Sequence, residues 1–251
     1  MLDQKSFIGR RILVTGGSSG IGRATAILLS RLGGQIVLTG RSGEKLSRAL
    51  SELDGPCHCS IPFDLRDFDS YDDLMRQCGA GGKLDGLVHC AGIAKPLPLK
   101  TVSPAAIAET MDTNFVSFML LAKYLSKKKH TNDGASLVAV SAVNVHYPQK
   151  CMSVYAASKA ALEAAVRTLA LELYPNRRLR VNALVVGPVA TPMGGAAEGD
   201  LSLVGTQSEI TPNLMGIASP DDIAKMAAIL LDDSSAYVTG RNFYVDGGRL
   251  G

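Results

Sequence analysis

Seven short runs of aliphatic and β-branched residues recur along this chain, and segments with the helical period separate them. This alternation is typical of parallel strands, because each parallel connection has to cross back over the sheet, usually as a helix. Some runs, such as residues 137–140, are apolar throughout, as expected of strands covered on both faces. The alternation predicts a doubly wound α/β fold with helices on both faces of a seven-stranded parallel sheet, its strands at residues 11–15, 35–39, 57–62, 84–90, 136–141, 180–186 and 242–246.

The chain has 251 residues, a length that single α/β domains commonly reach. No internal repeat, linker or low-complexity tract divides it, so we expect one domain over residues 1–251. Residues 190–218 are rich in glycine and lack a clear period. Because a long irregular loop in a compact domain is usually functional, we predict that this segment is a substrate loop.

Charge and hydropathy argue against several classes of partner. The net charge is only +3, and the one tight basic run, residues 127–130, lies where a helix should end and is typical of a solvated helix terminus. No window has the roughly 18 apolar residues of a membrane span, and the first residues lack the apolar stretch of a secretion signal. We therefore expect a cytoplasmic protein that binds neither nucleic acid nor membranes.

The five cysteines are odd in number and show no paired spacing, so we expect reduced thiols. The sequence CHC at residues 57–59 falls in a predicted strand, where successive side chains point to opposite faces. No second cluster of metal-binding residues follows it. The sequence therefore predicts no metal site.

A glycine-rich turn joins the first predicted strand to the first predicted helix. Gly16, Gly20 and Gly22 lie at this junction. Glycines there allow the backbone to approach a pyrophosphate, and the following helix offers unpaired N–H groups and the positive end of its dipole. A strand before the turn and a helix after it make nucleotide binding the favoured interpretation, through Gly16, Ser18, Ser19, Gly20, Ile21 and Gly22.

The end of the second strand discriminates between the two nicotinamide dinucleotides. An acidic residue there would bind the ribose 2′-hydroxyl of NAD, whereas a nearby arginine would accommodate the 2′-phosphate of NADP. This chain has no acid there, but it has Arg41 and Ser42, which suit a phosphate dianion and favour NADP(H) over NAD(H). After the third strand, Asp64 and Leu65 lie where a carboxylate could accept from an adenine amino group, although Asp64 could equally cap a loop or helix.

Tyr155 and Lys159 are four residues apart on a predicted helix and therefore share one face. Reduction of a ketone by hydride builds negative charge on oxygen, so the site needs a proton donor and groups that stabilise the alkoxide. A tyrosine ordinarily titrates near 10, and the positive charge of Lys159 should lower the pKa of Tyr155. Such a pair also occurs on helices by chance, but the glycine turn upstream makes catalysis the favoured interpretation.

Several motifs now occur together in a fixed order: TGGSSGIG at 15–22, CAG at 90–92, an asparagine in MDTNF, YAASK at 155–159 and GPVATP at 187–192. In this ordered set the chain resembles the one-domain short-chain dehydrogenases/reductases over essentially its whole length. It is most similar to 3-oxoacyl-carrier-protein reductases and related ketone reductases. The resemblance implies a Rossmann-type fold, a nicotinamide cofactor and a homodimer or homotetramer.

The resemblance also implies roles for individual residues. Tyr155 would be the general acid/base, Lys159 would hold the nicotinamide ribose, and Asn114 would complete a water-linked proton relay through Lys159. Cofactor contacts would come from Ala91 and Gly92 after the fourth strand and from Val189 and Thr191 after the sixth. The implied reaction is hydride transfer between NADP(H) and a ketone or secondary alcohol, either a small molecule or carrier-bound.

Two departures from the family pattern stand out. The serine that usually lies thirteen residues before the tyrosine is replaced by Ala142, and Ser141 lies one residue earlier. We favour Ser141 as the catalytic hydroxyl, because alanine cannot donate a hydrogen bond to the substrate oxygen; Asn144, His146 and Ser153 are possible substitutes. The family's NNAG is here HCAG, in which Cys90 should fill space as a small apolar group.

An alternative from another class stays open. The displaced serine is compatible with a dinucleotide-binding regulatory or scaffold protein whose catalytic set has eroded, whereas intact Asn114, Tyr155 and Lys159 favour an enzyme. If the fold is as predicted, His146, Tyr147, Cys151, Met152 and Met193 should surround the substrate.

Overall fold

The computed structural model describes residues 5–195 and 213–248. All seven strands form one parallel sheet in the order β3-β2-β1-β4-β5-β6-β7, which confirms the predicted fold class. The predicted strand positions are also confirmed, although the fifth strand begins earlier than expected and the third begins later. The strands are β1 (Arg11–Thr15), β2 (Gln35–Gly40), β3 (Cys59–Pro62), β4 (Leu84–His89), β5 (Thr131–Ala142), β6 (Arg180–Val186) and β7 (Asn242–Val245).

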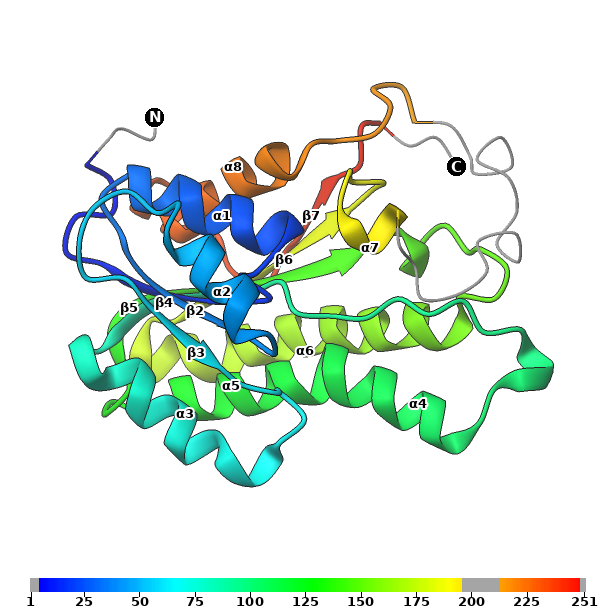
Figure 1. The fold of residues 1–251 in the computed structure, drawn as a ribbon, viewed down its shortest axis with the longest axis horizontal. Helices are drawn as coiled ribbons and strands as arrows, with labels where there is room; N and C mark the ends of the chain where they lie inside the picture. Colours follow the sequence, from blue (N-terminus) through cyan, green and yellow to red (C-terminus); the bar gives the residue numbers. More distant parts are fainter. Residues whose placement is uncertain (1–4, 196–212, 249–251) are drawn as a thin grey trace.

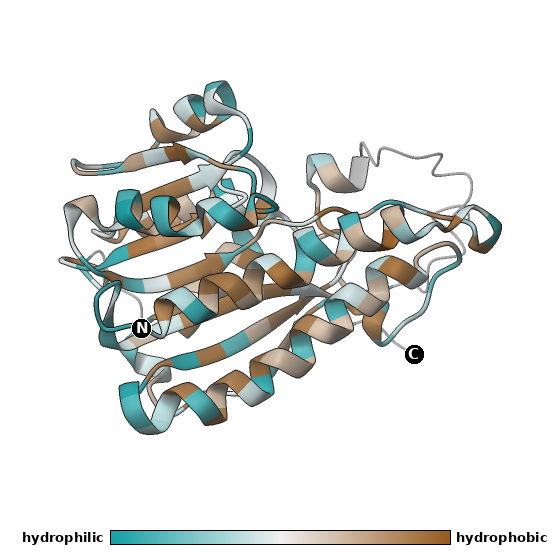
Figure 2. Ribbon diagram, turned by 90° about the horizontal axis from the view of Figure 1, so that it is seen from below, coloured by the Kyte–Doolittle hydropathy of each residue, from teal (hydrophilic) through white to brown (hydrophobic). Residues whose placement is uncertain are grey.

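Helices cover the sheet on both faces (Figure 1). On one face lie α1 (Gly20–Arg31), α2 (Gly43–Leu50) and α8 (Pro220–Leu231); on the other lie α3 (Tyr71–Cys78), α4 (Pro104–Met111), α5 (Ser117–Leu125) and α6 (Ser153–Arg177). A single turn, α7 (Pro192–Gly195), follows the loop after β6. Figure 2 shows apolar and polar segments alternating along the helices, as expected where one stripe of each helix faces the sheet.

Two buried apolar layers hold the sheet between the helices. Leu13, Leu87 and Leu137 point to the layer under α3, α5 and α6, whereas the neighbouring strand residues Val14 and Val88 point to the layer under α1, α2 and α8. This separation follows from the alternation of side chains along a strand. The same alternation decides which functional side chains reach the site.

The chain from Pro104 to Leu125 runs as one helical segment with an irregular centre. Between α4 and α5, residues Asp112–Val116 form a π-helical turn. Such turns are rare and often lie at functional sites. This one contains Asn114, whose side chain is fully buried.

The order of the sheet reverses between β1 and β4, because the chain adds β2 and β3 on one side of β1 and the later strands on the other. In such folds, ligands bind at the carboxyl ends of the strands beside the reversal. The predicted substrate loop at 190–218 falls partly beside this edge, but residues 196–212 lie outside the described residues. Over residues 5–195 and 213–248, no helix is long and apolar enough to cross a bilayer, and no cluster of acidic, histidine or cysteine side chains has the make-up of a metal site.

Candidate active site

The turn between β1 and α1 has a geometry that requires glycine. Gly16 has a φ of +64°, and a Cβ atom there would lie 2.9 Å from the backbone nitrogen of Ala91. A Cβ atom on Gly22 would lie 2.4 Å from the carbonyl oxygen of Gly16. The turn is therefore folded back on itself and against the end of β4, and it leaves the N-terminus of α1 open to a ligand.

The loop after β4 is tied to β1 through Thr15, which also contacts His89, one of the two residues that replace the family's asparagines. The hydroxyl of Thr15 accepts from the backbone N–H of Ala91 at 3.2 Å and lies 3.0 Å from Nδ1 of His89. Burial lowers the pKa of His89 to about 3, so its ring is neutral at physiological pH. Burial also raises the pKa of the Cys90 thiol to about 12, which keeps this thiol protonated. His89 thus braces the sheet where an amide usually does, and Cys90 behaves as a small apolar group.

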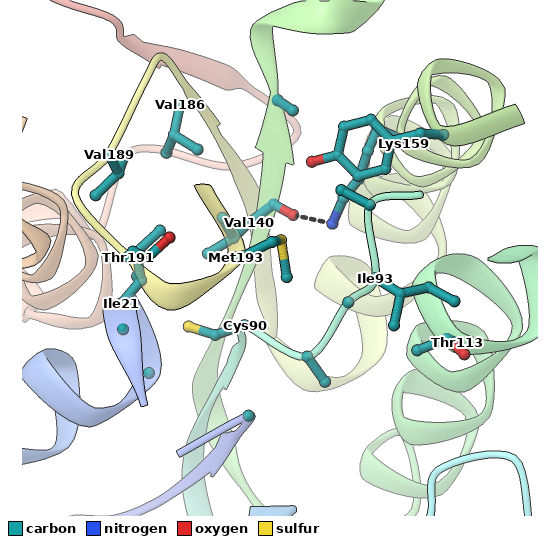
Figure 3. Close-up of a pocket in the computed structure, with 18 of the residues that line it drawn as sticks. Ile21, Cys90, Ile93, Thr113, Val140, Lys159, Val186, Val189, Thr191 and Met193 are labelled. Atoms are coloured by element: carbon teal, nitrogen blue, oxygen red, sulfur yellow. Dashed lines mark hydrogen bonds between the residues drawn. The ribbon is translucent and has the colours of Figure 1, made fainter. Parts of the chain in front are cut away.

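A cavity of about 540 Å³ opens at the carboxyl ends of the strands. Figure 3 shows Ile21, Val189, Thr191 and Met193 on one side of it and Ile93, Thr113 and Lys159 on the other. Most of the predicted site residues line this one cavity, namely Gly16, Ser18, Ser19, Gly20, Ile21, Gly22, Arg41, Asp64, Leu65, Ala91, Gly92, Ser141, Tyr155, Lys159, Val189 and Thr191.

Two predicted residues do not line the cavity. Ser42 lies at the N-terminus of α2, where its hydroxyl accepts from the backbone N–H of Lys45 at 3.3 Å and caps the helix. Asn114 lies behind the cavity wall, close to Gly92, whose added Cβ atom would come 3.2 Å from Oδ1 of Asn114. Both residues therefore lie behind the wall, Ser42 next to Arg41 and Asn114 beside Gly92 and Lys159.

Arg41 and Asp64, the two charged residues expected to contact the adenosine, differ in whether they already have a partner. Arg41 is exposed, and the described residues give its guanidinium no hydrogen bond or ion pair. Asp64 instead makes two bonds with the Arg66 side chain, at 3.1 and 2.7 Å, and accepts from the Arg66 backbone N–H at 3.0 Å. These bonds hold the pKa of Asp64 below its usual value, and the bonds from the Arg66 side chain have the largest effect. Arg41 is available to an anion, while Asp64 already serves as a loop cap.

Tyr155 and Lys159 project from the first turns of α6 into the cavity, and both side chains are buried. Burial raises the pKa of Tyr155 to about 12 and lowers the pKa of Lys159 to about 8. Nζ of Lys159 donates to the carbonyl of Val140 at 2.8 Å and lies 6.0 Å from the centre of the Tyr155 ring (Figure 3). The expected lowering of the Tyr155 pKa by Lys159 is thus wrong for this structure, in which burial shifts that pKa upward.

Asn114 clamps the loop after β4 to α6. Its Oδ1 accepts from the backbone N–H of Ile93 at 2.8 Å, and its Nδ2 donates to the Ile93 carbonyl at 3.0 Å and to Ser158 Oγ at 2.9 Å. These contacts occupy both amide N–H groups of the side chain. A proton relay through Asn114 would therefore have to use its main-chain carbonyl.

The structure contradicts our preference for Ser141 over Ala142. Ser141 lies on the same face of β5 as Leu137 and Ala139, the face covered by α6, and its hydroxyl donates to Glu163 Oε1 at 2.6 Å. Ala142, the next residue, packs with Tyr155. Since β5 continues without a bulge to Ala142, paired with β6 at each of these positions, the register of the strand turns Ser141 away from the tyrosine.

Sequence reasoning missed the anchor of this arrangement, Glu163. Its buried carboxylate accepts from Ser141, from His146 Nε2 at 3.0 Å and from Asn242 Nδ2 at 2.8 Å. The spacing held a signal, because Glu163 follows Lys159 by four residues on the same helix face.

Of the residues expected around the substrate, Met152 and Met193 line the cavity, whereas His146, Tyr147 and Cys151 do not. Gln149 lines it unexpectedly, in a loop without a sequence pattern that could have identified it. The wall near Tyr155 thus contains the amides of Gln149 and Asn144 in place of the imidazole, phenol and thiol expected there.

Comparison with known proteins identifies the family. A family model described as enoyl-(acyl carrier protein) reductase matches residues 16–249. The glucose 1-dehydrogenase of Gluconobacter oxydans (strain 621H) is 32% identical over 247 residues, which cover 96% of this chain and 92% of that protein. The chain belongs to the short-chain dehydrogenase/reductase family.

Other members of the family are similarly close. The D-erythrulose reductase of Gallus gallus is 30% identical, covering 98% of this chain and 97% of that protein. The crystal structure of a dehydrogenase/reductase from Sinorhizobium meliloti 1021 is 31% identical, with a TM-score of 0.88 and coverage of 99% of this chain and 98% of that one. Members of this family are oxidoreductases that act on alcohol and carbonyl groups with nicotinamide dinucleotides. This chain is therefore an oxidoreductase of that kind.

Proposed function

We propose that this short-chain dehydrogenase/reductase transfers hydride between NADP(H) and a ketone or secondary alcohol, with a small-molecule or carrier-bound substrate of the 3-oxoacyl type. The observation that carries the proposal is that a phosphate-binding glycine turn and the Tyr155–Lys159 pair line one cavity. We also propose a homodimer or homotetramer in the cytoplasm. The exposed apolar side chains of Leu171 and Tyr174 on α6 support an interface there.

The cavity fits a dinucleotide on the evidence of its own backbone. The close approach of Gly16 to Ala91 and of Gly22 to Gly16 leaves no room for a side chain at either glycine, so the backbone of the turn stays open at the N-terminus of α1. This turn would hold the pyrophosphate, and the guanidinium of Arg41, which has no partner within residues 5–195 and 213–248, would hold a 2′-phosphate. The absence of an acid at the end of β2 supports NADP(H) over NAD(H).

A bound dihydronicotinamide would supply a hydride to the carbonyl carbon. Tyr155 would give its proton to the substrate oxygen, and its raised pKa keeps the hydroxyl protonated at neutral pH. Lys159 would keep a positive charge near the developing alkoxide, since its pKa of about 8 leaves it mostly protonated at pH 7.

Turnover with a panel of ketones tests the reaction. The purified protein should oxidise NADPH with at least one of them, and Tyr155→Phe should reduce kcat by about 10³-fold while the Kd for NADPH stays within about twofold. Loss of the hydroxyl removes the proton donor but leaves the glycine turn unchanged. Tight NADPH binding without turnover on any ketone or alcohol would favour the regulatory or scaffold protein instead.

Cofactor choice has a separate test. Arg41→Ala should raise the KM for NADPH by about tenfold or more and the KM for NADH by less than about twofold, because only NADPH carries the 2′-phosphate. Arg48→Ala is the matched control, since Arg48 is exposed on α2 and its guanidinium pairs with Glu44. Equal effects of Arg41→Ala on both cofactors would contradict the preference for NADP(H).

A further inference from the structure

The proposed reduction leaves one requirement unmet. A carbonyl oxygen that becomes an alkoxide is stabilised by more than one hydrogen-bond donor, and Ala142, beside Tyr155, has none. We propose that the side-chain amide of Asn144 is this second donor and therefore a catalytic residue. The inference rests on the proposed function but concerns a residue to which that function gives no role.

Other donors near Tyr155 are already engaged. The Ser141 hydroxyl donates to Glu163. Lys159 Nζ donates to the carbonyl of Val140, and its two other N–H groups are needed for the nicotinamide ribose, the role that the family resemblance implies. The hydroxyl of Thr113, also in the cavity wall, donates to the carbonyl of Glu109 at 2.8 Å. Rotation of Ser141 toward the substrate would leave a buried carboxylate short of a donor, which is strongly unfavourable.

Asn144 lies in the right place for the role. The 3₁₀ turn Val143–Val145 follows Ala142 directly, and both Asn144 and Gln149 line the same cavity as Tyr155. Nδ2 of Asn144 donates to Oε1 of Gln149 at 2.6 Å. An amide nitrogen carries two hydrogens, so one N–H of Asn144 remains for the substrate oxygen.

Backbone contacts hold this amide pair in place. The carbonyl of Val143 accepts from the N–H groups of His146 and Tyr147 at 2.9 and 2.7 Å, and the carbonyl of Gln149 accepts from Met152 at 3.3 Å. Cys151 has a φ of +64°, and its carbonyl accepts from the N–H of Leu97 at 2.7 Å. A non-glycine residue in the left-handed region persists only where its surroundings require it, so the loop that carries the donor is well fixed.

The step remains balanced with Asn144 in this role. The carbonyl carbon gains the hydride, the C=O π electrons move to oxygen, and the oxygen takes the proton of Tyr155. Asn144 keeps its own protons and only donates a hydrogen bond that strengthens as charge develops on oxygen. Gln149 is a positioning residue, because it acts through Asn144.

A rescue experiment separates this role from a structural one. Asn144→Ala should lower kcat/KM by about a hundredfold with an active ketone. Adding Ala142→Ser to that variant should restore most of the activity, because a hydroxyl would then stand beside Tyr155. Loss of a loop contact would not be repaired by a hydroxyl at residue 142. Ala142→Ser alone measures the effect of the new hydroxyl while Asn144 is present. Asn132→Ala is the matched control, because Asn132 is exposed at the other end of β5 and bonds Asp85, and it should keep kcat/KM within about threefold of the wild type.

Binding gives a readout without turnover. The Kd of the ketone for the protein saturated with NADP⁺, measured by calorimetry, should rise several-fold in Asn144→Ala and fall again with Ala142→Ser. If Asn144→Ala does not fold, Asn144→Asp removes the N–H donors at nearly constant shape and should lose at least as much activity.

An active wild type with unchanged Asn144 variants, or a loss that Ala142→Ser does not repair, overturns the inference and leaves the proposed function standing. A wild type inactive on every ketone and alcohol would contradict the proposed function itself.

Discussion

The cavity has two halves that are built by different means, a cofactor half around the glycine turn at residues 16–22 and a substrate half around Tyr155 and residues 141–149. In the cofactor half, the essential contacts are between backbone atoms, and glycine is required because a Cβ on Gly22 would lie 2.4 Å from a backbone oxygen. In the substrate half, the contacts are between side chains, namely Ser141 with Glu163 and Asn144 with Gln149. A backbone constraint tolerates one residue type, whereas a side-chain contact can be moved to a neighbouring position. The glycine turn therefore keeps the family motif, whereas positions decided by side chains depart from it, Ala142 in the substrate half and His89 and Cys90 after β4.

Among the variants that compare the two halves, the largest effect should come from Lys159, which lies where they meet. Lys159→Met should reduce kcat by about 10²–10³-fold, because the positive charge near the reacting oxygen is lost. It should also stabilise the protein at pH 7 by about 1–3 kcal/mol. The pKa of Lys159 falls from 10.5 to about 8 on folding, which corresponds to roughly 3 kcal/mol against the charged form, less the lost bond to Val140.

The size of this stabilisation depends on pH. Below pH 8 the lysine is protonated in both the folded and unfolded states, so the folded protein bears the full penalty of burying the charge. As pH rises from about 8 to 10.5, the folded state loses the proton first and the advantage of Lys159→Met disappears. Denaturant unfolding at pH 7 and pH 10 measures it, with Lys123→Met on the surface of α5 as control. A variant less stable than wild type at pH 7 would contradict the buried charge.

The cofactor half should respond to a single methyl group. Gly22→Ala should raise the Kd for NADPH by about tenfold to a hundredfold, because the new Cβ forces the turn away from Gly16. Gly79→Ala is the matched control, since a Cβ at Gly79 meets no atom within 4 Å. Equal affinities of the two variants would show that the turn relaxes more easily than its backbone contacts indicate.

The fold was predictable because each signal was local and repeated. Alternating apolar runs such as 136–141 and 180–186 identified strands, and the glycine spacing at 16–22 identified the turn. These signals depend on backbone geometry, which only a few residue types satisfy. The ends of strands were less certain, since β5 begins at Thr131 in a polar stretch without strand character.

The substrate half was not predictable to the same degree. The choice between Ser141 and Ala142 depends on which face of β5 turns toward α6, and the chemistry of alanine argued for the wrong residue. Glu163 reaches Ser141 through a tertiary contact, 22 residues away in the chain, and Gln149 reaches Asn144 across five residues of an irregular loop. A donor that is displaced from its motif position can be found only when the strand register is known.

Ser141→Ala should have the smallest effect on activity and gives the most direct test of that register. Because the hydroxyl is bonded to Glu163 beneath α6, its removal should change kcat/KM by less than about twofold, while the free energy of unfolding falls by about 1–3 kcal/mol as the buried carboxylate loses a donor. Steady-state kinetics and denaturant unfolding of one preparation measure both. Ser153→Ala, at the exposed start of α6, is the control for a serine outside this contact. A large loss of kcat/KM with unchanged stability would mean that Ser141 reaches the substrate, and the two halves would then follow the family pattern equally.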